Sequence, residues 1–170
     1  DLMEQKNVLT EDAASAEIVN RYFRSARNRM GRIIATASEA IIHRDPQTRA
    51  IFLTGTPLTK LATDTMLSAT GCPIALLYAG RIGAGFSKGP VSLYDFYKVF
   101  PFSNILVTMR LTGEQIRRNI ETGMRTLSHD GASPLAIGGL TVTIDPGLPY
   151  GERVLDVRLP DGTPLEPNAC

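Results

Sequence analysis

The sequence is poor in several features on which common protein functions depend. It has two histidines and two cysteines in 170 residues, and Lys+Arg 18 against Asp+Glu 17 leave a net charge of +1. This balance gives no reason to expect nucleic acid or a membrane surface as a partner. There is no apolar run long enough to span a bilayer and no secretory signal. The chain opens on Asp1 rather than Met, which indicates a processed or excised piece and leaves a removed signal open.

Histidine and cysteine are too sparse to suggest a metal site or an active site. His43 and His129 lie far apart in polar segments, and neither has metal-ligand spacing with Cys, Asp or another His. Both are therefore expected at the surface. Cys72 and Cys170 make one possible pair or remain two thiols. Because no serine sits in a nucleophile elbow either, the sequence predicts no catalytic residue and no metal ligand.

What is present is a globular composition in which helical and strand periods alternate. With 43% hydrophobic residues, the chain can build one domain with its own core. Residues 10–30 and 56–71 have helical periods, and residues 74–78, 140–144 and 155–159 have strand patterns. This alternation predicts an α/β (α+β) domain with mixed sheets covered by helices. The arginine row of the first helix fits a solvated face better than a docking face.

The stretch Val91–Met124 is the most informative part of the sequence. Ser92 can cap a helix whose apolar residues form one stripe, Leu93, Phe96, Tyr97 and Phe100. Pro101 ends that helix, and from Ile105 the period changes to two, as in a strand. Thr112 and Gln115 then have capping-box spacing. The expected order is helix, sharp turn, strand, helix.

Two loops next to predicted strands are candidate binding sites. In the turn Phe100–Asn104, Phe102 either plugs the core or offers a flat aromatic face to a planar ligand. The glycines after Tyr78 let backbone N–H groups approach a ligand, although their spacing fits neither a Walker loop nor a dinucleotide fingerprint. Since ligands of α/β proteins gather at strand ends, a pocket is expected between Tyr78–Gly85 and Phe100–Asn104. The alternative is that Phe102 and Tyr78 pack together and close this cleft.

Three runs of the sequence resemble the C-terminal domain of the 5′-nucleotidase family. The first run is VSLYDFYKVFPFSNILVTMRLTGEQIRRNIE. It matches, in order, that family's short helix, a Pro-Phe-Gly-Asn-like turn, a strand and the Leu-Thr-Gly-x-x-Leu start of a second helix. The family's apolar strand running into Asn-x-Gly-Gly-Ile-Arg is matched by IALLYAGRIGAGF, and its closing strands by IGGLTVTIDPGLPYGERVLDVRLPDGTPLEP. The resemblance extends from about Arg49 to Pro167, and several separate motifs keep their order and spacing.

The resemblance implies substrate-binding roles for five residues. Phe102 matches the phenylalanine that packs against the nucleobase, and Asn104 matches the Asn of the same turn. Gly80 matches a glycine of the Asn-x-Gly-Gly-Ile-Arg loop. Tyr78 replaces the Asn of that loop and can supply a second ring. Arg81 stands two positions before the family arginine and is the only charge within the loop.

The sequence also departs from the family pattern, so its substrate-binding motifs are degenerate. The loop arginine is Gly83 here, and a further family arginine falls at Thr54. An arginine fork grips phosphate or sugar oxygens in a fixed geometry, and losing one such charge-assisted bond costs about 1.5–3 kcal/mol. The family's later Gly-Gly-Asp-Gly segment, which carries the second stacking aromatic, does not occur before Cys170. The sequence therefore supports membership of the 5′-nucleotidase family better than it supports specific binding of nucleotides.

The resemblance implies a layered α/β/β/α fold and a division of the chain into two parts. Residues 1–48 are expected to form a connecting helix and a lead-in strand, and residues 49–170 a substrate-binding domain truncated at its C-terminus. In the family, two divalent metal ions sit in a separate N-terminal metallophosphoesterase domain, so no cofactor is expected in this chain. The expected partners are a nucleoside or nucleotide and that N-terminal domain, in the periplasm or outside the cell.

Three functions remain open at this stage. The first is a substrate-recognition domain of a 5′-nucleotidase-like phosphoester hydrolase that serves nucleotide catabolism. The second is the thiosulfohydrolase branch of the same superfamily, which acts on a sulfur-carrying protein and would not need the nucleotide arginines. The third is a domain that has lost small-molecule binding and serves as a scaffold or interaction surface.

A catalytic test follows from the absence of a metal cluster and of a nucleophile–base pair in the sequence. The isolated 170-residue chain is expected to release no phosphate from AMP with Mg²⁺, Mn²⁺ or Zn²⁺ added, as measured by a colorimetric phosphate assay. Robust release by the pure chain, abolished by one point mutation in it, would overturn this expectation.

Overall fold

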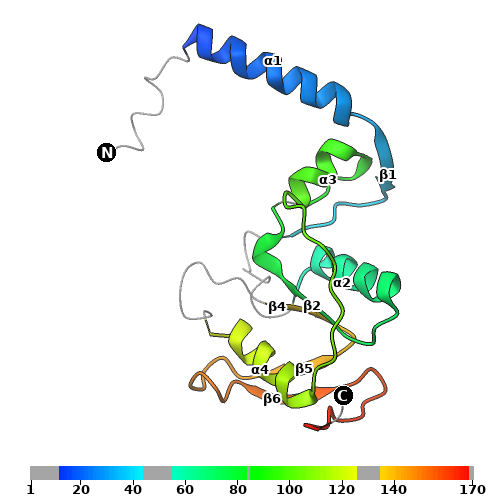
Figure 1. Ribbon diagram of the computed structural model, residues 1–170, viewed down its shortest axis with the longest axis vertical. Helices are drawn as coiled ribbons and strands as arrows, with labels where there is room; N and C mark the ends of the chain where they lie inside the picture. Colours follow the sequence, from blue (N-terminus) through cyan, green and yellow to red (C-terminus); the bar gives the residue numbers. More distant parts are fainter. Residues whose placement is uncertain (1–11, 44–54, 84, 126–134, 169–170) are drawn as a thin grey trace.

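The computed structural model describes residues 12–43, 55–83, 85–125 and 135–168. The elements lie along an elongated body, with α1 (Ala13–Met30) at one end and the strands β5 (Thr141–Ile144) and β6 (Val154–Arg158) at the other (Figure 1). The remaining elements, in chain order, are β1 (Ile33–Ala37), α2 (Pro57–Thr70), β2 (Ala75–Tyr78), the 3₁₀ turn η3 (Ala79–Arg81), β3 (Gly89–Ser92), α3 (Leu93–Val99), α4 (Gly113–Gly123) and β4 (Leu135–Gly138). The α/β class is confirmed.

The strands pair into small antiparallel sheets of two strands each. The pairs are β1 with β3, β2 with β4, and β5 with β6. The first pair joins β1, which precedes the predicted boundary at residue 48, to β3, which follows it. Helix α2 packs against both β2 and β4. All described strand pairs are antiparallel. Which strand pairs with which could not be predicted, because the sequence of a strand does not specify its partner.

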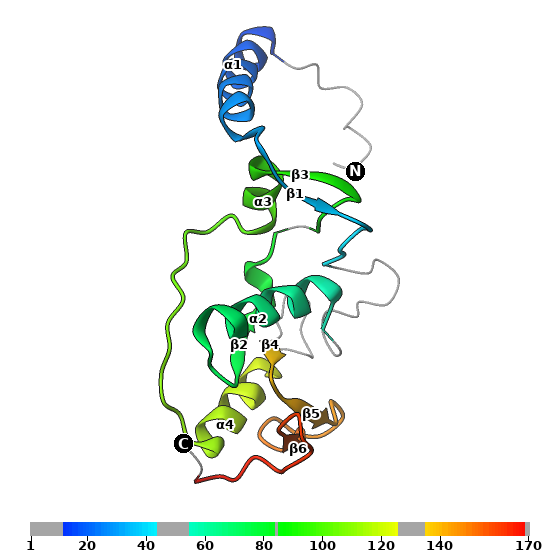
Figure 2. The ribbon, with the colours of Figure 1, turned by 90° about the vertical axis from the view of Figure 1, so that its right-hand side faces the viewer.

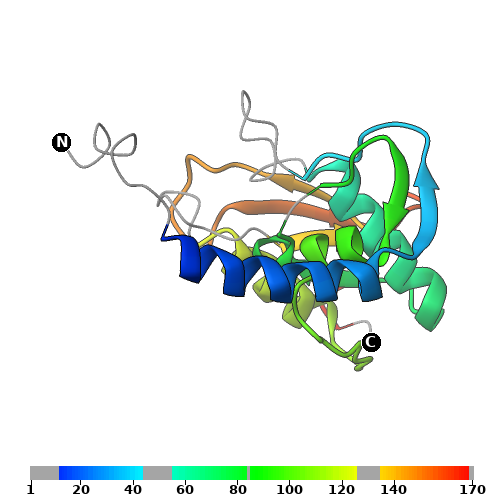
Figure 3. The same ribbon diagram turned by 90° about the horizontal axis from the view of Figure 1, so that it is seen from above.

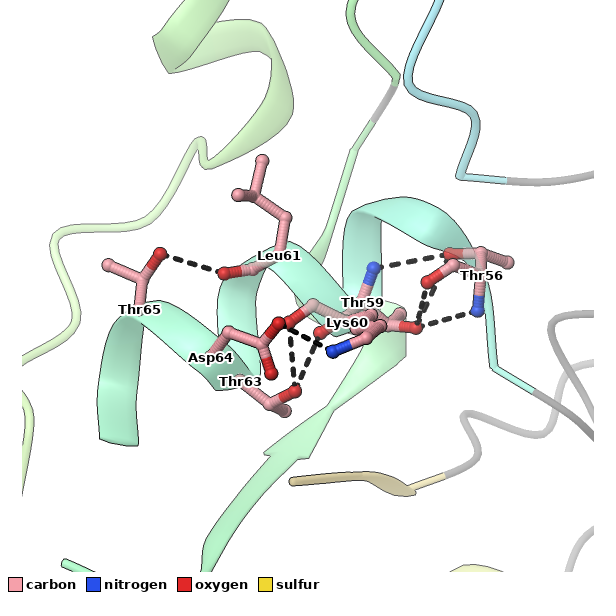
Figure 4. Close-up of polar contacts among 7 residues, drawn as sticks. All are labelled: Thr56, Thr59, Lys60, Leu61, Thr63, Asp64 and Thr65. Atoms are coloured by element: carbon pink, nitrogen blue, oxygen red, sulfur yellow. Dashed lines mark hydrogen bonds and ion pairs between the residues drawn. The ribbon is translucent and has the colours of Figure 1, made fainter. Parts of the chain in front are cut away.

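Helix termini lie where the sequence places their caps. Thr56 accepts a hydrogen bond from the backbone N–H of Thr59 at 3.2 Å, and Thr59 Oγ1 accepts one from the N–H of Thr56 at 2.7 Å (Figure 4). The same reciprocal arrangement caps α3 at Ser92 and α4 at Thr112. Gly71 ends α2 in the left-handed conformation, with φ of 66°, which glycine adopts without steric cost. Local capping therefore fixes three of the helix starts.

Two main apolar clusters, with a small third one at Ala79 and Ala136, form the core of the described residues. The larger one joins α4 to the sheets through Ile116, Ile120, Met124, Leu135, Val154 and Val157. The second joins α2, the loop after η3 and α3 through Leu58, Ile82 and Val99. Helix α1 contacts α3 but leaves its apolar stripe largely exposed, and Figure 3 shows it lying lengthwise across the end of the body. Most buried apolar residues thus lie in two places, around α4 and between α2 and α3.

Glu121 ties α4 to the chain just before β6. Its buried carboxylate accepts hydrogen bonds from the backbone N–H groups of Gly151 at 2.7 Å, Val154 at 2.9 Å and Arg153 at 3.3 Å. The Arg153 guanidinium in turn donates to the carbonyl of Met124 at 2.5 Å. Because Val154 belongs to the larger cluster, this carboxylate satisfies a backbone donor, the N–H of Val154, that packing has removed from water.

Three local expectations from the sequence are wrong or incomplete. His43 was expected at the surface but is buried, while His129 lies outside the described residues. The strand predicted at residues 155–159 begins one residue earlier as β6 and buries Val154 and Val157, while Leu155 is exposed, because a bulge opposite residues 143–144 shifts the register by one residue. The stretch from Ile105 is extended but pairs with no described strand.

Replacing Glu121 with alanine tests the link between α4 and β6. The Glu121→Ala variant should lose about 3 kcal/mol of unfolding free energy in urea denaturation, because the buried N–H of Val154 and two partly buried N–H groups are left without their acceptor. The matched control is Glu114→Ala on the same helix, whose carboxylate makes a surface ion pair with Arg118 at 2.9 Å. That change should cost less than about 0.5 kcal/mol. Equal losses would refute the special role of Glu121.

Candidate functional site

A large apolar groove is the candidate site. Its volume is about 960 Å³, and its walls come from α2, from β1 and β3, from α3 and from the turn that follows α3. Helix α2 contributes Leu61, Thr65 and Met66, and β1 contributes residues 34–37. These elements surround the middle of the body in Figure 2. The volume is at the upper end of the range typical of small-molecule pockets.

Aromatic rings from α3 form one wall of the groove. Phe96, Tyr97 and Phe100 all line it. Phe96 packs edge-on against Tyr97, with ring centroids 6.1 Å apart, and lies 5.3 Å from the Phe100 ring. The buried residue of this helix is instead Val99, at 1% exposure. The three rings of the stripe therefore face the groove, while Val99 anchors the helix in the core and Phe100 also packs against the same cluster.

The described lining of the groove carries no charged side chain. Among the described residues that line it there is no Lys, Arg, His, Asp or Glu. Its polar groups are the hydroxyls of Thr36, Thr65, Tyr97 and Ser103 and the amide of Asn104. Such a surface suits a flat, uncharged group that buries its faces against rings and makes hydrogen bonds at its edges. It does not suit a phosphate, which binds best to cations or to clustered N–H donors.

The five residues predicted from the sequence divide into two sets. Phe102 and Asn104 line the groove, and the Phe102 side chain is 50% exposed. Tyr78, at the end of β2, is 46% exposed and is not part of the lining. Gly80 lies in η3 and is exposed, also outside the lining. The backbone of Arg81 ends η3, and its side chain lies outside what the structure describes.

The loop after β2 nevertheless contacts the end of α3, from which the second candidate loop begins. The N–H of Gly83 donates to the carbonyl of Val99 at 2.7 Å, and Ile82 lines the groove beside the turn residues. A Cβ atom at Gly83 would lie 2.5 Å from the carbonyl oxygen of Lys98. Position 83 is where the resemblance places an arginine. An arginine there would require the end of α3 to move, so the close approach of the two loops itself excludes that side chain.

Groove residues such as Phe86, Phe96 and Tyr97 were not identified from the sequence as site residues. A signal was present in α3, where Leu93, Phe96, Tyr97 and Phe100 place three aromatic rings on one face of a seven-residue helix and its C-cap. A helix of this length needs fewer than three aromatic rings to pack against the core, so the extra rings were a signal of a second role. The direction in which that face points depends on the orientation of α3 relative to β3, and no local sequence pattern specifies this orientation.

The described residues do not offer a metal site or a membrane span. They contain no group of three His, Cys, Asp or Glu side chains placed to hold a metal ion. Cys72 is a free, partly buried thiol, and Cys170 lies outside the described part. Within the described ranges, no helix has both the length and the apolarity needed to cross a bilayer.

Comparison with known proteins identifies relatives along most of the chain. The family model for the 5′-nucleotidase, C-terminal domain, matches residues 33–170. The trifunctional nucleotide phosphoesterase protein YfkN of Bacillus subtilis (strain 168) is 33% identical over 108 residues, which make up 61% of this chain and 7% of that protein. The chain therefore spans only a small part of this curated relative.

Solved structures share the fold. A 5′-nucleotidase precursor from Thermus thermophilus superposes with a TM-score of 0.82 at 32% identity, covering 94% of this chain and 32% of that one. The sulfate thiohydrolase SoxB of Thermus thermophilus superposes with a TM-score of 0.66 at 18% identity, covering 95% of this chain and 30% of that one. The second likeness concerns the fold alone.

The exposure of Phe102 leads to a test of its role in stability. Because half of the side chain is exposed, Phe102→Ala should lower the free energy of unfolding by less than about 1 kcal/mol, well under the roughly 3–5 kcal/mol of a buried phenylalanine. Leu58→Ala, which removes a fully buried residue of the second cluster, should cost about 2–5 kcal/mol in the same urea titration. Similar losses for the two variants would place Phe102 in the core instead.

Proposed function

Because the chain belongs to the family of 5′-nucleotidase C-terminal domains, we propose that it is the substrate-recognition domain of a 5′-nucleotidase-like phosphoester hydrolase that serves nucleotide catabolism. The observation that carries this proposal is the position of Phe102 and Asn104 on an uncharged aromatic groove. Both residues match the turn that packs against the nucleobase in the family. The groove has the surface that a nucleobase requires, with apolar faces and a few hydrogen-bonding groups.

The proposal divides the substrate between two parts of the intact protein. The base, which is flat and uncharged, lies against Phe102 and the rings of α3. The phosphate lies outside the groove, because no cation lines the described part of it. The described residues also do not fit a pair of divalent metal ions. We therefore assign the metal ions and the hydrolytic step to an N-terminal metallophosphoesterase domain. From the likeness to a 5′-nucleotidase precursor, we further propose that the protein works in the periplasm or outside the cell.

A second candidate is the thiosulfohydrolase branch of the superfamily. The observation in its favour is Gly83, since the crowding by the Lys98 carbonyl excludes the arginine that the resemblance places there. A substrate without a nucleoside would not need that guanidinium. The aromatic lining of the groove favours the first candidate, because its rings match the flat faces of a nucleobase, which the sulfur-carrying protein of the second candidate does not supply. A pure scaffold role would leave the groove without a small-molecule ligand.

Binding of adenosine to the 170-residue chain tests the proposal. Ligand-observed NMR at millimolar adenosine should show binding, and Phe102→Ala should weaken it by at least about fivefold, since an aromatic stacking contact is worth about 1 kcal/mol. Tyr78→Ala is the matched control, because it removes a ring of similar exposure that lies outside the groove lining. It should leave the affinity within about twofold of the wild type.

Two results would contradict the proposal for this chain. If adenosine gives no detectable binding at millimolar concentration, the nucleoside assignment fails. If Tyr78→Ala weakens binding as much as Phe102→Ala does, the ligand sits at the loop after β2 and not in the groove.

A further inference from the structure

Helix α1 carries an apolar stripe that the rest of the described chain does not cover. Its members have the spacing of one helix face, and each is between 51% and 67% exposed: Ile18, Val19, Tyr22 and Phe23. Among the side chains of α1 that the structure describes, only those of Ala16 and Met30 are partly buried. A helix of 18 residues is marginal by itself in water. This helix therefore lacks most of the surface that would stabilise it.

The same part of the chain is strongly basic. Between Ile18 and Ser38 there is no aspartate or glutamate, although the whole chain has a net charge of only +1. The interval contains five arginines, which are Arg21, Arg24, Arg27, Arg29 and Arg32. The balance over the whole chain therefore hides a local excess of positive charge, whose field reaches about 8–10 Å at physiological salt.

Aromatic and charged groups lie side by side on α1. The Arg21 guanidinium lies 5.6 Å from the centroid of the Tyr22 ring, and Arg24 is exposed on the same helix. A solvated face explains the arginines but does not explain four exposed apolar side chains among them. Apolar and aromatic residues on one side of a helix, with arginines on its other sides, are typical of helices that lie in the plane of a membrane interface.

The position of α1 lets a flat surface reach the stripe. The helix lies lengthwise across one end of the body and is the outermost described element there (Figures 1 and 3). At 1.5 Å per residue, its 18 residues extend about 27 Å along that end. Nucleic acid would use the arginines and leave the stripe in water, whereas a bilayer interface accepts both.

We propose that α1 docks the protein on membranes that contain anionic lipids. The arginines bind the lipid phosphates through charge-assisted hydrogen bonds, and the stripe enters the boundary between headgroups and acyl chains. The contact is peripheral, because no helix within the described ranges can cross a bilayer. Since α1 contributes no residue to the described lining of the groove, membrane binding and adenosine binding are separate properties.

Co-sedimentation of the 170-residue chain with lipid vesicles tests the proposal. Vesicles of phosphatidylcholine and phosphatidylglycerol should bind the chain at least about tenfold more tightly than vesicles of phosphatidylcholine alone, because the arginines are attracted only to the anionic surface. Raising the NaCl concentration from about 0.05 M to about 0.5 M should weaken the binding, since salt screens this attraction.

Two double variants of α1 separate its two contributions. Both Tyr22→Ala/Phe23→Ala and Arg21→Glu/Arg24→Glu should weaken binding to the anionic vesicles by at least about tenfold. The matched control is Val107→Ala/Met109→Ala, which shortens two side chains of 61% and 68% exposure outside α1. It should leave the affinity within about twofold of the wild type. Circular dichroism of each variant checks that its helices are retained.

Several outcomes would refute the proposal. They include no binding to the anionic vesicles, or an equal loss in the Tyr22→Ala/Phe23→Ala variant and in the control. A dimer that the same variant abolishes, seen by light scattering in a chain that binds no vesicles, would make a second copy the occupant of the stripe. Vesicle binding that is lost in a longer protein with the metallophosphoesterase domain would make that domain the occupant. Tighter binding to duplex DNA, unaffected by Tyr22→Ala/Phe23→Ala, would assign the arginines to nucleic acid.

Discussion

The need of every buried backbone N–H and C=O group for a partner governs this structure. The described strands form sheets of only two strands, which are marginal by themselves in water. Each pair therefore depends on what packs against it. Helix α2 lies on β2 and β4, and α4 lies against β6, where the Glu121 carboxylate supplies acceptors for three N–H groups that no strand takes.

The parts of the fold that local chemistry determines could be predicted from the sequence. Ser92 and the pair Thr112–Gln115 cap their helices where expected, and Thr56 and Gly71 bound α2 at the two ends of the predicted helical period. Each signal acts within about four residues and needs no tertiary contact. The class of fold followed from the alternation of periods. Pairing could not be predicted in the same way, because Ile105–Leu111 has the alternation of a strand but no described partner.

The candidate site was only partly predictable for the same reason. Phe102 and Asn104 line the groove, and their position in a turn after a proline-terminated helix was a local signal. Tyr78 has the right neighbours in sequence, yet the way β2 pairs with β4 leaves it outside the lining. Conversely, Phe96 and Tyr97 line the groove because Val99 occupies the core, a competition among side chains of one helix that periodicity alone does not decide.

The uncharged lining of the groove has a consequence for the ionic conditions under which the domain works. Mobile ions weaken attraction between charges over about 8–10 Å at physiological salt, but they have little effect on the burial of a flat apolar surface. A ligand held only by the described lining would bind almost equally in dilute and saline surroundings. Any strong salt dependence of the intact protein then reports on the region that handles the phosphate, and not on the groove.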